Sequence, residues 1–168
     1  MHPIDKNQVT QYVLSKLMEW YNDVDEKGGP NDLSILKTLK LIFLLCTVNV
    51  DKDNQNLLDL CYDNFVAMPL GPVELSTYNF FSRSIFIDKK TLHFQNLEIS
   101  DFEGKCIVDS CIEVLKHKNP RLITYTASQL VDLTHKYSCW IINYNKGISL
   151  REPIRNDEIK RDEKFYYI

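Results

Sequence analysis

The chain has 168 residues, of which 44% are hydrophobic and 26% charged, and its formal net charge is −3. These values fit one folded domain that can bury most of its apolar surface. The acidic balance argues against broad, charge-driven binding to nucleic acid, which needs a basic face. The N-terminus lacks the apolar core of a signal peptide and no apolar run is long enough to cross a bilayer, so we expect a cytoplasmic protein.

Two helices are predicted at the start of the chain. Residues 5–26 carry apolar residues at helical spacing, and the Gly-Gly-Pro at 28–30 ends that helix. Asn31 or Asp32 can then cap a second helix that runs to about residue 48. This second helix is apolar nearly all round, which predicts a central place in the core.

The stretch FVAMPLGPVELSTY at 65–78 is predicted to be a loop that closes onto a helix. Gly71 can take backbone angles that other residues avoid, and Pro72 suits the first helical position, where its missing N–H costs nothing. A short helix at 57–62 leads into this stretch, and the new helix should run to about Ser82.

Residues 84–95 have two β-rich runs around a polar centre at 88–90, which predicts a β-hairpin. The fold class expected from these patterns is mainly α, a single compact helical domain with one small inserted β-hairpin at about residues 84–95.

The second half is predicted to be helical again. Ser100 and Glu103 form a capping-box pattern, so a helix should begin near Asp101 and run to about residue 117, with a break at Gly104. Thr126 can cap the next helix with Gln129 in the reciprocal position, and residues 137–145 form another. We expect one domain over 1–168, with 148–168 as a C-terminal extension packed on it and a short helix near 156–164.

Motifs for catalysis and for cofactor or metal binding are mostly absent. The chain has no GxGxxG, GxxxxGK[ST], GxSxG or HExxH sequence. The five cysteines form no CxxC pair, and their odd number argues against a full disulfide framework, so we expect reduced, buried thiols. His135 and Cys139 lie four residues apart; a histidine at a helix end beside a buried thiol is favoured over a metal site or a nucleophile pair. We expect no enzyme, no cofactor and no metal.

Three segments carry a family resemblance. They are FVAMPLGPVELSTY at 65–78, LVDLTHKYSCW at 130–140 and LKTLKLIFLLC at 36–46. Together, in this order, they resemble the SocA-like, or Panacea, antitoxin domain over roughly residues 33–144. The chain departs from the family pattern at Cys139, where proline often stands, and at 68–70, where an aromatic residue often lies beside the glycine.

The resemblance implies an α-rich bacterial or phage domain that neutralises a co-encoded protein toxin by direct binding. One branch of the family instead delivers its toxin to a protease, and a small enzyme using His135 is a further alternative. Some relatives carry an added DNA-binding module, which we do not expect here, and DNA is not an expected partner. The apolar C-terminus could dock on its own core, on a second copy to give a homodimer, or on the partner. The residues that the resemblance marks for partner binding or as motif are Met68, Leu70, Gly71, Pro72, Val73, Tyr78, Thr134, His135 and Trp140.

We expect the motif at 65–78 and the motif at 130–140 to pack against each other. Thr134 and His135 could donate hydrogen bonds to carbonyls around Leu70, and Trp140 could cover the ring of Pro72. Whether these residues fasten the loop or contact the toxin directly stays open at this point.

Overall fold

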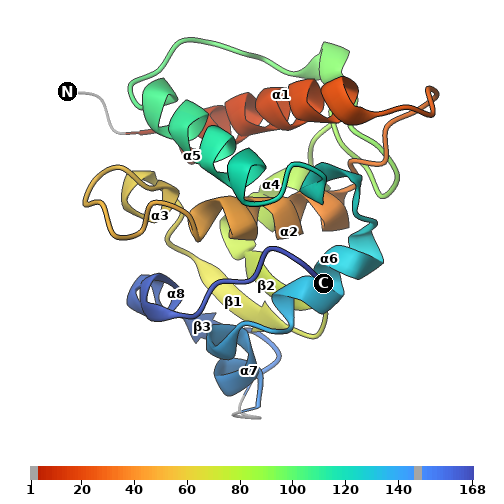
Figure 1. Cartoon of the computed structure of the whole chain (residues 1–168). Coiled ribbons are helices and arrows are strands. Elements are labelled where there is room, and N and C mark those ends of the chain that lie inside the picture. The colour runs from red at the N-terminus through yellow and green to blue at the C-terminus, as the bar shows by residue number, and fades with distance from the viewer. Residues whose placement is uncertain (1–3, 146–148) are drawn as a thin grey trace.

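The computed structural model describes residues 4–145 and 149–168, and these residues are mainly α-helical (Figure 1). The helices are α1 (Lys6–Val24), α2 (Ile35–Cys46), α3 (Leu57–Leu60), α4 (Leu75–Ser82), α5 (Lys105–Lys118), α6 (Ala127–Thr134), α7 (Ser138–Tyr144) and α8 (Asn156–Arg161). The strands are β1 (Phe65–Met68), β2 (Gly71–Glu74) and β3 (Glu152–Ile154). The expected fold class, mainly α with a small β element, is confirmed. Among the described residues, no helix is long and apolar enough to cross a bilayer.

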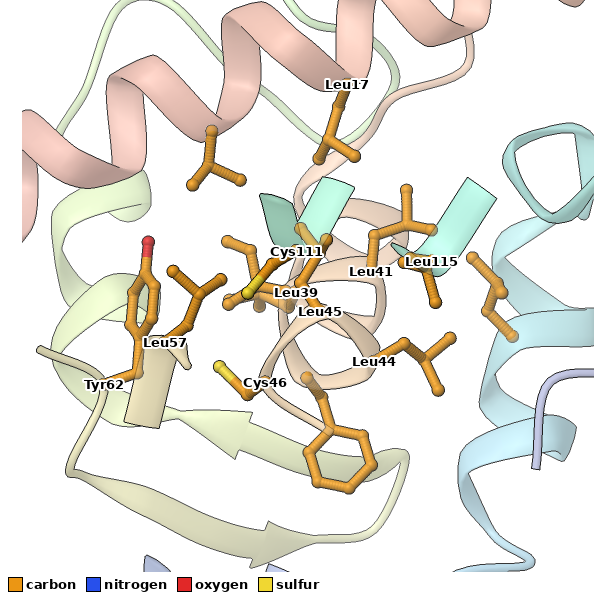
Figure 2. Close-up of a cluster of buried hydrophobic side chains, with 14 of the residues drawn as sticks. Leu17, Leu39, Leu41, Leu44, Leu45, Cys46, Leu57, Tyr62, Cys111 and Leu115 are labelled. Atoms are coloured by element: carbon orange, nitrogen blue, oxygen red, sulfur yellow. The ribbon is translucent and has the colours of Figure 1, made fainter. Parts of the chain in front are cut away.

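Helix α2 is the centre of the core, as its composition predicts. Every residue from 37 to 46 is buried. Figure 1 shows α1 and α5 on one side of α2 and the β1–β2 pair on the other. Leu41, Leu44 and Leu45 meet side chains from several of these elements in the buried cluster of Figure 2. Burial of apolar side chains around one helix is the main source of stability here.

The N-terminal cap of α2 differs from the prediction. Ser34, rather than Asn31 or Asp32, accepts a hydrogen bond from the Lys37 backbone N–H at 3.2 Å. Asn31 is engaged elsewhere, because its side chain accepts from the N–H of Leu92 at 3.0 Å and donates to the carbonyl of Leu92 at 2.9 Å. The side chain of Asn31, which the local sequence predicts as a helix cap, therefore forms a long-range contact with Leu92 instead.

The stretch at 65–78 contains a β-hairpin, so the prediction that Pro72 begins a helix is wrong. Strands β1 and β2 pair antiparallel, with Met68 opposite Gly71 and Ala67 opposite Pro72. The sheet order is β2-β1-β3, so β2 is an edge strand, where a missing proline N–H is tolerated. Helix α4 begins three residues later, at Leu75, and ends at Ser82 as predicted.

Residues 84–95 return on themselves, but without regular strands. The antiparallel pairing is an isolated bridge between Ile87 and Leu92, extended by a 2.7 Å hydrogen bond from the N–H of His93 to the carbonyl of Phe86. Asn31 occupies the outward backbone groups of Leu92, which a further strand would otherwise pair with. The regular hairpin of this fold is therefore at 65–74 and not at 84–95.

In the second half, one helix start is confirmed and one is wrong. Thr126 and Gln129 form the predicted capping box, and α6 follows it. Helix α5 instead begins at Lys105, after Gly104 in the left-handed conformation with φ +107°. The hydroxyl of Ser100 accepts a hydrogen bond from the side chain of Gln8 in α1, and the N-cap of α5 is Gly104, so the predicted capping box at 100–103 does not begin this helix.

The C-terminal residues join the rest of the fold. Strand β3 pairs antiparallel with β1, with Phe65 opposite Ile154. The Tyr137 hydroxyl donates to the carbonyl of Phe165 at 2.7 Å and accepts from its N–H at 2.9 Å. The expected short helix is present as α8, although it ends at Arg161. Residue 148, where the expected extension begins, lies outside the described residues.

Candidate functional site: a groove beside the hairpin

A groove of about 880 Å³ lies between α2, the β1–β2 hairpin, α4 and the residues that follow α4. We refer to it as the hairpin groove. Its walls are mostly apolar and include Leu36, Leu39, Met68, Leu70, Val73 and Tyr78. Leu70, at the tip of the β1–β2 turn, is 53% exposed, which is high for a large apolar side chain beside a pocket. An apolar concave surface of this kind is suited to binding rather than to hydration.

The residues marked by the family resemblance fall into three sets around the hairpin turn. Met68, Leu70, Val73 and Tyr78 line the hairpin groove. Gly71 and Pro72 are buried in β2. Thr134 ends α6, His135 follows it, and Trp140 lies on α7.

Gly71 is the point where the two motifs meet. Its φ is +111°, a conformation that residues with a Cβ rarely adopt. A Cβ at this position would also lie 2.7 Å from Oγ1 of Thr134 and 3.2 Å from Nζ of Lys40. Both the backbone angle and the lack of space therefore require glycine, and the expected packing of the motifs is present.

The contacts that fasten the turn are not all those expected. The indole Nε1 of Trp140 donates to the carbonyl of Met68 at 2.8 Å. The hydroxyl of Thr134 donates to Val131 in its own helix, at 3.0 Å, so the hydrogen bond expected from it to the carbonyls around Leu70 is wrong. Threonine in a helix often satisfies its hydroxyl in this local way.

His135 belongs to an aromatic stack. Its ring lies parallel to that of Trp140, with 4.0 Å between centroids and 12° between planes, and Trp140 stacks in turn on Tyr144. Burial and the nearby charge of Lys40 lower the pKa of His135, while the backbone of Pro69 acts in the opposite direction. Its buried Nε2 has no hydrogen-bond partner among the described residues.

The His135 and Cys139 pair fits the structural interpretation better than a catalytic or metal site. Cys139 is buried, and burial raises the pKa of its thiol far above the ordinary value, which keeps the thiol protonated and unreactive. The described residues contain no group of three or more His, Cys, Asp or Glu side chains that could hold a metal ion. The expectation of buried thiols holds for Cys46 and Cys111 as well, whereas Cys106 is exposed and Cys61 is half-buried.

Lys40 is a functional candidate that the sequence analysis missed. It lies on α2 with no exposed surface, and its Nζ donates to the carbonyl of Pro72 at 2.8 Å. Within the described residues no carboxylate forms an ion pair with it, and burial lowers its pKa to about 7. The sequence does contain a signal for a buried lysine at this position, because Lys40 lies in a helix that is apolar nearly all round.

Glu74 holds the other end of β2. Its buried carboxylate pairs with Lys6 of α1 at 2.7 Å and accepts from the N–H groups of Thr77 and Asn64. The same side chain thus caps α4 and ties the hairpin to α1. The groove wall formed by β2 is fixed at both ends, by Lys40 and by Glu74.

The comparison with protein families identifies the family of this chain. A family model described as the antitoxin SocA-like, Panacea domain matches residues 39–141. The chain belongs to this family. The matched region runs from α2 to α7, so it includes the hairpin, most of the groove walls and the stacked pair of His135 and Trp140. A comparison of this chain with the curated proteins and with the solved structures found no match.

Proposed function

We propose that this Panacea domain is an antitoxin that neutralises a protein toxin by forming a complex with it in the cytoplasm, without catalysis. The toxin would be encoded by an adjacent gene. The observation that carries the proposal is the hairpin groove, because residues of the family motif at 65–78 form an apolar binding surface there.

The groove has the features of an anchor site for a protein partner. Protein interfaces concentrate their binding energy in a few pockets that exclude water, where aromatic and apolar side chains are enriched. Tyr78 and Phe81 supply aromatic walls, and Leu70 supplies an exposed apolar tip. The bonds made by Trp140 and Lys40 hold the turn in place, which lowers the entropy cost of binding.

A substitution at the turn tip tests this function. Leu70→Asp places a charge at the rim of the groove, on a side chain that is 53% exposed. Leu150→Asp is the matched control, since Leu150 is 72% exposed and is not one of the residues that line the groove. Each variant is co-expressed with the product of the adjacent gene, and growth and recovery of the complex are measured. We expect Leu70→Asp to lose both growth rescue and complex formation, while Leu150→Asp retains them. A harmless adjacent gene product that never co-purifies would contradict the proposal.

Two other functions are distinguished by different measurements. A protease adaptor would shorten the lifetime of the toxin in a pulse-chase experiment, whereas sequestration leaves the lifetime unchanged. An enzyme using His135 is less well supported, because the ring is stacked against Trp140 and the thiol of Cys139 stays protonated. Growth rescue by a His135→Gln variant that folds normally would argue against catalysis.

A further inference from the structure

The hairpin groove carries positive charge on apolar walls. Its lining contains two lysines, Lys40 and Lys89, and one carboxylate, that of Asp88. The Asp88 carboxylate is already engaged, since Oδ1 accepts from the N–H groups of Lys90 and Thr91 and Oδ2 pairs with Nε2 of His93 at 2.8 Å. With Lys40 protonated, the described residues of the lining carry two positive charges and one negative charge.

Lys40 is the unusual member of this set. A buried ammonium group is costly unless it is paired and its three N–H donors are satisfied. Lys40 donates to one protein acceptor, the carbonyl of Pro72. Lys37, three residues earlier on the same helix and equally buried, pairs with Asp32 at 2.8 Å and also donates to the carbonyl of Ile123 at 2.7 Å. The fold thus provides a carboxylate for Lys37 and none, in the described residues, for Lys40.

We propose that the hairpin groove takes an apolar segment of a protein partner that carries one carboxylate, and that this carboxylate pairs with Lys40. The inference rests on the proposed function in taking the partner to be a protein. Lys40 borders the groove but has no exposed surface in the free protein, so the lining side chains must move aside as the segment enters. The apolar side chains of the segment fill the walls, and the carboxylate compensates the lysine charge in a site without water.

This pairing would give specificity as well as affinity. A partner segment with a neutral side chain at that place leaves the ammonium buried with a single acceptor, and one with a basic side chain adds repulsion. The groove would therefore discriminate among apolar segments by one acidic residue.

The test selects peptides from a displayed library of random 16-residue sequences against the full-length protein. A selected peptide is then made with its acidic residue as Glu and as Gln, and both dissociation constants are measured by fluorescence anisotropy on the wild type and on Lys40→Met. We expect apolar peptides with one acidic residue at a fixed position. The Gln peptide should bind the wild type at least about 10-fold more weakly, and the two peptides should bind Lys40→Met within about 2-fold of each other.

A pH series on the wild type avoids dependence on the folding of Lys40→Met. Between pH 6.5 and 8.5 Lys40 loses its charge, because burial lowers its pKa to about 7. Over this range Asp88 stays ionised, since its hydrogen bonds with His93 and two backbone N–H groups lower its pKa to about 2. His135 stays mostly neutral, because burial and Lys40 lower its pKa. The Glu peptide should bind more weakly as pH rises, and the Gln peptide should not.

The inference is overturned if the library yields no binder, if the selected peptides lack an acidic residue, or if the Glu-to-Gln change costs the same on Lys40→Met. These outcomes are separate from failure of the proposed function. A toxin that binds through the groove without an acidic residue would retain the function and overturn the pairing. Peptides that bind through their acidic residue, from a protein that binds no toxin, would support the pairing with Lys40 and contradict the proposed function.

Discussion

The indole Nε1 of Trp140 donates a 2.8 Å hydrogen bond to the carbonyl of Met68, and this bond joins two of the segments that carry the family resemblance. Met68 ends β1, directly before the turn that carries Leu70. Residues 72 positions apart are thus held together at the rim of the hairpin groove. The position of the hairpin groove therefore depends on a residue that lies on α7.

Replacing Trp140 separates its structural role from a direct role in binding. Trp140→Phe keeps an aromatic ring for the stack with His135 but leaves the Met68 carbonyl without its donor, which should lower the free energy of unfolding by about 1–2 kcal/mol. Trp140→Ala also removes the stack and should cost about 3 kcal/mol. Urea denaturation measures both. Ile142→Ala, an exposed position on the same helix, serves as the control and should change stability by less than about 0.5 kcal/mol. If Trp140→Phe is as stable as the wild type but loses the partner, Trp140 contacts the partner directly.

Gly71→Ala should be strongly destabilising, by about 2–4 kcal/mol, because strain at positive φ adds to a collision with Thr134. Gly29→Ala is a matched control, since Gly29 has φ +80° but nothing within 4 Å of an added Cβ. It should cost only about 1 kcal/mol. Adding Thr134→Ala to Gly71→Ala removes the colliding Oγ1 and should recover part of the loss. If urea denaturation gives the same loss of stability for both glycine substitutions, the side chains around Gly71 move aside without cost, which would contradict the prediction.

Lys40→Met should change how stability depends on pH. In the unfolded chain the pKa of Lys40 is near 10.5, whereas burial lowers it to about 7 in the folded protein. Between these values the unfolded state holds a proton that the folded state has released, so the Lys40 contribution to the free energy of unfolding rises with pH. The wild type should gain about 2 kcal/mol relative to Lys40→Met between pH 6.5 and 8.5.

The difference between the two proteins isolates Lys40 from groups that titrate in both. His135 is the titratable neighbour to control for, since Lys40 helps to lower its pKa, and His135→Gln in both backgrounds removes its contribution. Parallel pH profiles for the wild type and Lys40→Met would show that Lys40 keeps an ordinary pKa in the folded protein.

Truncation before Phe165 should lower stability by about 2–4 kcal/mol without changing the oligomeric state. It removes the two hydrogen bonds between Phe165 and the Tyr137 hydroxyl, together with the bond from the Asn119 side chain to the carbonyl of Tyr166 at 2.7 Å. Removal of residues 167–168, whose side chains are exposed, is the control and should have little effect. Thermal unfolding and size-exclusion chromatography provide the measurements. A stable truncated protein that shifts from dimer to monomer would assign the segment to a second copy instead.

Much of the helical framework follows from local sequence. The helix at 6–24 follows its apolar stripe, α6 follows the Thr126–Gln129 capping box, and α2 is central because it is apolar nearly all round. These features depend on residues three or four positions apart, which meet on one helix whatever the rest of the chain does. The ordered motifs also identify the family without any structure.

The tertiary structure decided what the stretch at 65–78 becomes and what surface it forms. Gly71-Pro72 fits a helix start by local stereochemistry. In the fold, however, these residues form a strand that pairs with β1, and β1 also pairs with β3 at 152–154. The same holds for Asn31, which bonds Leu92 instead of capping α2. It also holds for Lys40, because only the folded structure reveals that it has no carboxylate partner among the described residues. Hydrogen-bond partners and burial are set by residues far apart in the chain, so no local pattern can specify them.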